Sequence, residues 1–405
     1  MILLLVVLLV FCVLGATIVL PRQAAIFWML ALETSPDSWL DQWAGLAQHE
    51  TIIGITKAYG IVLAVALALR HGMRRDRYNP GFAFATMFLT GLLHGLFPGL
   101  SLLSSLRSLI GSASPFLFSF IRLDRPFRHA VIWAALWGPF CTVCFGAVLA
   151  AIGLDHMYVL EQGALRLGAS GEPPFLAGFA LVGIYAALVE IAGTPRRQTV
   201  ASLAVNLVII LLTGARMPLA IAGFEILALL LLQRRLLLLA ASGAGIAAAL
   251  LFSGALSFLR IIDLTKLGEA TDLSHRGLVW PYFEAAFWSS PFIGWGVGAG
   301  KVIIPLTSRL DQFLGTNAAH DEYLRIGAEG GMFGLALLIA LLALWVRRGS
   351  AAMAPDQRLM VRLIFIGFAV HSATDNTMIA TTSSVFFLWA SCIFANAENG
   401  TTAAA

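Results

Sequence analysis

Charged side chains are scarce in this sequence. Only 12% of its 405 residues are Asp, Glu, Lys or Arg, whereas 59% are hydrophobic. The apolar share of a soluble protein is about 45–50%. Together with a mean hydropathy of +0.86, this composition excludes a soluble protein and predicts a polytopic membrane protein.

Metal-ligating patterns are also missing. The four cysteines (Cys12, Cys141, Cys144 and Cys392) lie in apolar segments without a nearby cluster of histidines or carboxylates, which favours packing over a metal or disulfide role. The eight histidines show no metal-ligand spacing, and there is no G-x-S-x-G elbow. We therefore expect neither a metal site nor a cofactor.

A nucleotide-binding loop is missing as well. The glycines of GWGVGAGK at 294–301 suggest a phosphate loop, but Trp295 and Val302 stand where the P-loop pattern needs glycine and Ser or Thr. No strand pattern precedes them. We interpret this segment as a backbone turn that approaches a neighbouring element closely.

Long apolar runs dominate what is present. Runs of this length can cross about 30 Å of hydrocarbon as helices. The first run has no basic segment before it and no A-x-A site after it, so it reads as a retained span. The sequence predicts an all-α fold, one integral-membrane domain over 1–405 with about twelve transmembrane helices, near 1–20, 51–69, 81–97, 101–120, 129–153, 175–193, 197–213, 217–233, 236–255, 323–346, 359–377 and 380–396.

Arginines alternate between the connectors of these spans. Cytoplasmic loops of membrane proteins retain Lys and Arg, and every second connector here is basic, whereas the connectors 21–50 and 154–174 are mixed or acidic. This pattern predicts that both termini are cytoplasmic and that the second set of connectors is external. The basic connectors hold Arg70, Arg74, Arg75 and Arg77; Arg122, Arg125 and Arg128; Arg196 and Arg197; Arg234 and Arg235; and Arg347, Arg348 and Arg358.

The longest predicted external connector covers residues 256–322. A connector of this length is usually functional or disordered, and its many aromatic residues argue against disorder. We expect a periplasmic loop that folds onto the membrane boundary through short amphipathic helices, one of them around Arg276 to Trp288.

One histidine lies where this loop meets the next predicted span. Asn317 is a candidate N-cap, and Asp321 and Glu322 suit a first helical turn, which places His320 at the helix start. A neutral histidine there can accept a proton from a hydroxyl as a general base. The alternative is a histidine that only forms hydrogen bonds at a hydrated helix end.

Two arginines lie in other external elements. Arg216 follows the turn TGAR at 213–216, and Arg276 begins the aromatic part of the long loop. Two guanidinium groups from different elements can hold a pyrophosphate by bidentate hydrogen bonds. Either could instead contact lipid headgroups. Asp321 and Arg325 are spaced as a structural i,i+4 pair.

Together these residues resemble the O-antigen ligase and polymerase family of bacterial envelope glycosyltransferases. The likeness covers most of the C-terminal half. It is carried by His320, Asp321, Leu324, Glu329, Gly331 and Gly334; by Arg276, Trp280 and the run PFIGWGVG at 291–298; by TGAR at 213–216; by RLGASGEPPFLAG from Arg166; and by Asp375 with Asn376.

The resemblance implies metal-independent, inverting transfer of a glycan from undecaprenyl pyrophosphate to an acceptor hydroxyl at the periplasmic face of the inner membrane. It implies that His320 activates the acceptor and that Arg216 and Arg276 hold the donor pyrophosphate. The acceptor of a ligase is the lipid A core, and that of a polymerase is another lipid-linked glycan. Candidate supporting residues are Arg166, Asp321, Glu329 and Asp375.

Three functions are weighed. A ligase and a polymerase share the donor and differ in an acceptor site that the sequence does not label. A transporter or lipid flippase would carry charges near the bilayer midplane and often two related halves. Lys57 and Arg107 are the clear candidates for such charges, and no internal repeat is visible. Glycan transfer is therefore preferred over transport, with a ligase as the first hypothesis and a polymerase as the alternative.

Overall fold

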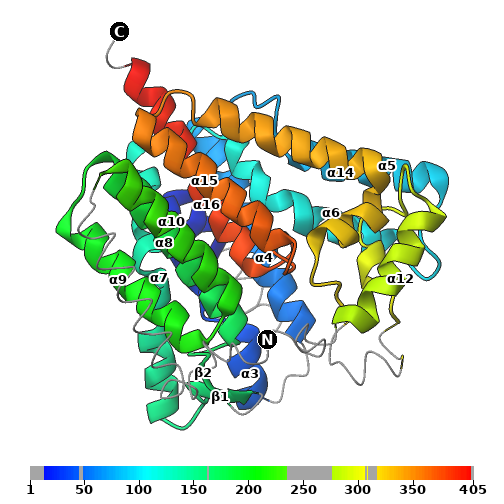
Figure 1. The fold of residues 1–405 in the computed structure, drawn as a ribbon, viewed down its shortest axis with the longest axis horizontal. Coiled ribbons are helices and arrows are strands. Elements are labelled where there is room, and N and C mark those ends of the chain that lie inside the picture. The colour runs from blue at the N-terminus through cyan, green and yellow to red at the C-terminus, as the bar shows by residue number, and fades with distance from the viewer. Residues whose placement is uncertain are drawn as a thin grey trace.

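The computed structural model describes residues 13–44, 49–161, 164–234, 276–305, 308 and 317–402. These residues are mostly helical, as predicted, and Figure 1 shows long helices packed side by side, with α14 drawn above α6 in this view and beside α12. The elements are α2 (Pro21–Glu33), α3 (Pro36–Ala44), α4 (His49–His71), α5 (Gly81–His94), α6 (Leu102–Ala113), the 3₁₀ helix η1 (Ser114–Phe120), α7 (Arg125–Ala151), β1 (Tyr158–Glu161), β2 (Ala164–Leu167), α8 (Pro173–Gly193), α9 (Arg197–Thr213), α10 (Arg216–Leu232), α12 (Arg276–Ser289), the 3₁₀ helix η5 (Ala299–Lys301), α14 (Glu322–Gly349), α15 (Pro355–Ser372) and α16 (Thr381–Thr402).

Four of the described helices are long and apolar enough to cross a membrane, namely Thr51–His71 of α4 and the whole of α7, α8 and α14. Gly81–His94, Arg197–Thr213 and Thr381–Ala397 are apolar but shorter. The chain is thus a membrane protein by composition and helix length, and the number of twelve spans stays a prediction. The predicted span near 236–255, most of the loop 256–322 and the first twelve residues of the run 1–20 lie outside the described residues.

The prediction of an external connector over 21–50 is wrong for its first part. Residues 13–19 and α2 form two consecutive helices, and Trp28, Met29 and Leu32 of α2 are almost fully buried against the bundle. Arg70 at the end of α4 donates to the carbonyls of Ile18 and Val19, so α2 starts where α4 ends and runs through the bundle. At 13 residues α2 is shorter than a spanning run, which is why the length criterion missed it.

Two further boundaries differ from the sequence analysis. The predicted span 101–120 is broken into α6 and η1 at Ser114, because Pro115 lacks a backbone N–H for a continuing helix. In the connector 154–174, β1 and β2 form an antiparallel hairpin with Val159 opposite Arg166. The fold is therefore helical with one small two-stranded sheet in its described part.

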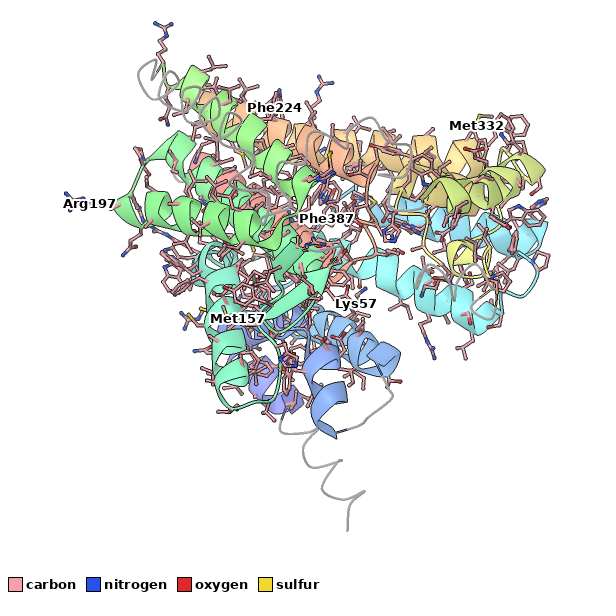
Figure 2. The ribbon with its side chains drawn as sticks, turned by 60° about the horizontal axis from the view of Figure 1, so that its bottom comes forward. Lys57, Met157, Arg197, Phe224, Met332 and Phe387 are labelled. Atoms are coloured by element: carbon pink, nitrogen blue, oxygen red, sulfur yellow. The ribbon has the colours of Figure 1, made fainter. Side chains whose placement is uncertain are left out.

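Helix α16 lies at the centre of the aromatic core. Its side chains Phe386, Phe387 and Trp389 are almost fully buried, and Figure 2 shows Phe387 in the interior of the molecule. The Phe387 ring lies 4.3 Å from that of Phe116 in η1, and the Phe386 ring stacks 4.6 Å from that of Phe368 in α15. These contacts fix α16 against helices from both halves of the chain.

The bundle has two chemically different ends. At one end, Gln357 donates to the carbonyl of Val189, and Arg128 donates to that of Ala395. The starts of α7, α9 and α15 and the ends of α8, α14 and α16 lie at this end. We call it the basic end, because it carries the arginines at 122–128, 196–197, 347–348 and 358.

The other end joins the opposite termini of the same helices. Tyr323 near the start of α14 donates to the carbonyl of Ala369 in α15, and Gly178 near the start of α8 lies against Thr382 at the start of α16. The turn between α9 and α10 and the loop between α15 and α16 are at this end. We call it the histidine end, because it carries His320.

Candidate active site

Asp321 starts helix α14. Its side-chain oxygen accepts hydrogen bonds from the backbone N–H groups of Tyr323, at 2.8 Å, and Leu324, at 3.1 Å, so Asp321 is the N-cap. The prediction of Asn317 as the cap is wrong, because its side-chain amide donates instead to the carbonyl of Lys301. Residues of the loop thus lie directly in front of the helix start.

Arg325 pairs with two glutamates. Its Nε donates to Glu322 at 2.7 Å and its Nη1 to Glu329 at 2.8 Å, and all three side chains are buried. The predicted pair of Asp321 with Arg325 is therefore wrong, since Asp321 is used as the cap. These two buried ion pairs link the first two turns of α14.

Helix α14 is interrupted at Gly331. Gly331 has φ 61° and ψ −169°, a conformation that only glycine adopts readily. The interruption leaves the carbonyls of Ala328 and Glu329 to accept hydrogen bonds from the backbone N–H groups of Trp295 and Gly296. The glycine-rich segment is thus a turn that approaches a neighbouring backbone closely, as predicted, and the neighbour is the interrupted turn of α14.

Glu329 links this turn to the charged side chains. Its Oε1 accepts a hydrogen bond from the N–H of Gly300 at 3.3 Å, while its Oε2 accepts from Arg325. Glu329 is therefore a supporting residue in a structural sense, since it holds the loop 294–301 against the start of α14.

His320 lies directly before the cap in a left-handed backbone conformation, with φ 50°. The preceding carbonyl, of Ala319, accepts a hydrogen bond from the indole of Trp280 in α12. The imidazole Nδ1 of His320 lies 3.5 Å from Oδ1 of Asp375 and 3.4 Å from the side-chain amide of Asn376. A constrained backbone and a loop from 55 residues later in the chain together determine where the imidazole points.

Asp375 lies between two histidines. Its Oδ2 is 3.8 Å from Nε2 of His371, one helical turn earlier. Burial raises the pKa of the Asp375 carboxyl, but the hydrogen bond with His320 and the electrostatic interaction with His371 outweigh this effect and lower the pKa below its usual value. An ionised Asp375 favours the tautomer of His320 that carries its proton on Nδ1, which leaves Nε2 as the basic nitrogen.

The loop with Asp375 is held from two sides. The backbone N–H of Met378 donates to Oε1 of Glu322 at 2.8 Å, and the ammonium group of Lys57 in α4 donates to the carbonyl of Ile379. Lys57 also lies within electrostatic range of Lys301 and Asp37. Lys57, considered above as a midplane charge of a transporter, therefore lies at the histidine end, beside the candidate site.

Arg166 supports the turn before Arg216. Its guanidinium is buried, donates from Nε to the carbonyl of Thr213 at 2.7 Å, and pairs with Glu161 across the hairpin. Gly214 then adopts φ 65°, which allows the chain to turn sharply and place Arg216 as the first residue of α10. Arg216 is thus at the same end of the bundle as His320.

Arg276 is the first residue of α12. Its side chain lies outside the described part of the structure, as do the twenty residues before it in the loop. A helix is present where one was predicted around 276–288, namely α12, which packs against α14. Its buried residues Phe283 and Ala286 share a core cluster with Ala328 of α14.

Comparison with known families identifies this region. A family model described as O-antigen ligase matches residues 201–339, from α9 to the middle of α14. The chain carries an O-antigen ligase family domain. No curated protein matches the sequence. The matched segment of the O-antigen ligase domain includes Arg216, Arg276 and His320, whereas Arg166 and Asp375 lie outside it on either side.

Sequence reasoning missed two residues of this site. His371 belongs to no recognised motif, but its i,i+4 spacing to Asp375 is a signal that the sequence offers. The sequence alone marks Lys57 only as a charge within a predicted membrane span. Its position beside Ile379, 322 residues later in the chain, follows from the packing of α4 against the loop before α16.

Proposed function

We propose that this protein is an O-antigen ligase-like glycosyltransferase that moves a glycan from undecaprenyl pyrophosphate to a sugar hydroxyl of the lipid A core at the periplasmic face. The single observation that carries the proposal is the contact of His320 with Asp375 at the start of α14, within the O-antigen ligase domain and at the same end of the bundle as Arg216.

In this proposal His320 acts as the general base. The acceptor hydroxyl gives its proton to Nε2 of His320, while Asp375 stabilises the imidazolium that forms. The acceptor oxygen then bonds to the anomeric carbon as the bond from that carbon to the pyrophosphate oxygen breaks. Because the attack and the departure are on opposite faces of the sugar, the anomeric configuration inverts.

The leaving pyrophosphate needs positive charge. Arg216 and Arg276 are proposed to hold it by bidentate hydrogen bonds. Arg166 supports this group indirectly, since it holds the turn before Arg216. Lys57 and Lys301 add positive charge at the same end. No step of this transfer uses a metal or a cofactor, so activity is expected to persist in a chelator.

The alternative is a polymerase of O-antigen or exopolysaccharide with the same chemistry. Deleting the gene and separating the envelope polysaccharide on a gel decides between the two. Lipid A core without long chains, together with accumulated lipid-linked polymer, supports the ligase. Chains of a single repeat on the lipid A core support the polymerase, and unchanged polysaccharide contradicts both.

A further inference from the structure

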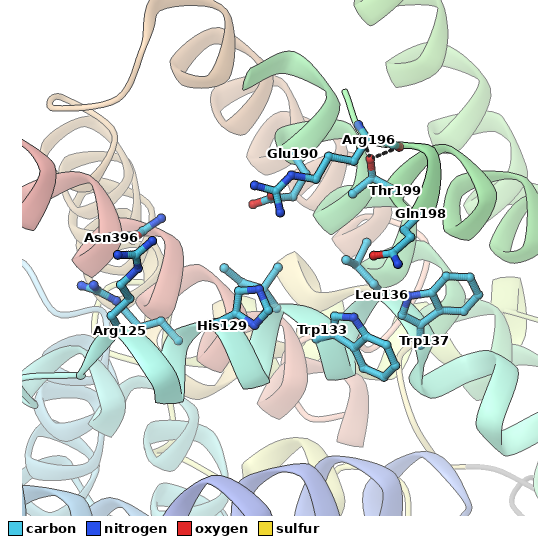
Figure 3. A pocket seen from close by; sticks show the side chains of 12 residues that line it. Arg125, His129, Trp133, Leu136, Trp137, Glu190, Arg196, Gln198, Thr199 and Asn396 are labelled. Atoms are coloured by element: carbon cyan, nitrogen blue, oxygen red, sulfur yellow. Dashed lines mark hydrogen bonds between the residues drawn. The ribbon is translucent and has the colours of Figure 1, made fainter. Parts of the chain in front are cut away.

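A polar cavity lies at the basic end, away from His320. It has a volume of about 250 Å³ and lies between the start of α7, the end of α8, the start of α9 and the end of α16 (Figure 3). The proposed glycan transfer uses none of the residues that line it. The chemistry of its lining residues therefore needs a separate explanation.

Positive charge dominates this cavity. Arg125 and Arg128 line it from α7, and Arg196 lines it from the residue before α9. Glu190 is the one carboxylate among the lining residues and lies near Arg196. Arg128 is 4% exposed and donates from Nη1 to the carbonyl of Ala395, but its Nε–H has no hydrogen-bond partner among the described residues. Buried donors are normally satisfied, and Arg128 lines the cavity, so this N–H is available to an anionic ligand there.

The first turn of α9 adds to the positive potential. Gln198 and Thr199 line the cavity, and the N-terminus of a helix carries partial positive charge and favours anions. An anion in the cavity would thus meet guanidinium groups and a helix N-terminus together, which is an arrangement suited to phosphate.

The lining of α7 changes from charged to apolar along its axis. Arg125, His129, Trp133 and Trp137 follow one another at intervals of four residues, and Figure 3 shows them in this order along the helix. Each interval is about 6 Å of helix. Trp133 is 51% exposed, and its ring lies 6.2 Å from that of Trp137.

We propose that this cavity binds the headgroup phosphate of an anionic phospholipid. The arginines hold the phosphate, and the glycerol and the start of an acyl chain lie along Trp133 and Trp137. A lipid is favoured over a free phosphate ion, because α7 is a candidate membrane span and the apolar row leads from the cavity along that helix.

Binding can be measured by native mass spectrometry of the full chain in detergent. The probes are dioleoyl phosphatidylglycerol, the zwitterionic dioleoyl phosphatidylcholine and sodium phosphate. The wild type is expected to retain phosphatidylglycerol over phosphatidylcholine. The double variant Arg125→Gln/Arg196→Gln should lose about five-fold in affinity for each removed charge.

The chain offers a matched control beside Arg196. Arg197 is exposed, is not among the residues that line the cavity and projects away from the molecule in Figure 2, so Arg197→Gln should retain wild-type affinity within two-fold. Trp133→Ala should weaken binding of the lipid, whereas Phe224→Ala, at an exposed aromatic residue of α10, should not. If the double variant is not recovered, the two single variants test the same ranking.

Three results would overturn the proposal. Phosphatidylglycerol binding that is equal in the wild type and in the arginine variants would remove the role of the cavity. Equal retention of both lipids would remove the charge selectivity. Sodium phosphate that binds tightly in the wild type and in Trp133→Ala, and displaces the lipid, would assign the cavity to a free ion instead.

Discussion

The two ends of the bundle use charge in different ways. At the histidine end, titratable groups pair with one another within the chain: Arg325 with Glu322 and Glu329, and His320 and His371 with Asp375. At the basic end, three arginines share a cavity with one carboxylate. The first arrangement suits precise orientation of a reacting group, and the second suits capture of an anion from outside.

The largest expected effect is at the histidine end. Replacing His320 with Ala removes the proposed base, and general-base catalysis contributes about 10²–10⁴-fold to a rate. We expect transfer from a lipid-linked donor to fall by this factor while expression and thermal unfolding stay near wild type, since His320 is partly exposed. Arg197→Gln at the other end is the control. Full activity of His320→Ala would refute the assignment.

Arg325→Met tests whether the histidine end depends on its buried charges. The change leaves Glu322 and Glu329 buried without their partner, and breaking such a pair costs about 3–5 kcal/mol. A clear fall in the apparent unfolding temperature of the purified protein is expected. Arg347→Met, at an exposed arginine near the other end of α14, should change it little. Equal unfolding temperatures for the two variants would show that the triad does not stabilise α14.

Arg216→Lys tests whether the histidine end binds the donor pyrophosphate through a guanidinium group. Lysine keeps the charge but lacks the planar fork of the guanidinium. We expect about a ten-fold loss in kcat/KM for the donor, equivalent to about 1.4 kcal/mol, with the affinity of the basic-end cavity for phosphatidylglycerol unchanged. Steady-state kinetics with varied donor measure it. Wild-type kinetics would mean that Arg216 only contributes charge or structure.

The smallest expected effect concerns the pH dependence of Asp375. In the folded protein the pKa of Asp375 lies below its ordinary value of 3.8. The contribution of Asp375 to stability is therefore fully present above about pH 3.8 and is lost as the pH falls through the lower pKa of the folded state. The difference in unfolding temperature between wild type and Asp375→Asn should therefore persist from neutral pH to about 4. Asp356→Asn, at an exposed carboxylate of the basic end, is the control. A difference that vanishes already near pH 6 would contradict the assignment.

Part of the fold was readable from local sequence. The apolar runs predicted α4, α7, α8, α9, α10, α14, α15 and α16 within a few residues, since a membrane-spanning helix leaves a long, uninterrupted signal. The signal failed where a helix is short, as in α2, or where a proline divides it, as between α6 and η1. It also missed the hairpin of β1 and β2, whose strands have four residues each.

The sequence by itself determined that this is a helical membrane protein, and it marked His320, Arg216 and Asp375 as candidates through their motifs. Only the tertiary structure decided which side chains meet. It paired Arg325 with two glutamates instead of Asp321, set Asp375 between His320 and His371, brought Lys57 to the loop before α16, and gathered three arginines around one cavity. The physical reason is that helix formation depends on local hydrophobicity. The choice among neighbouring partners depends on which side chains are already used, as Asp321 is by the cap, and a contact such as that of Lys57 with Ile379, 322 residues later, depends on how the buried faces of many helices pack together.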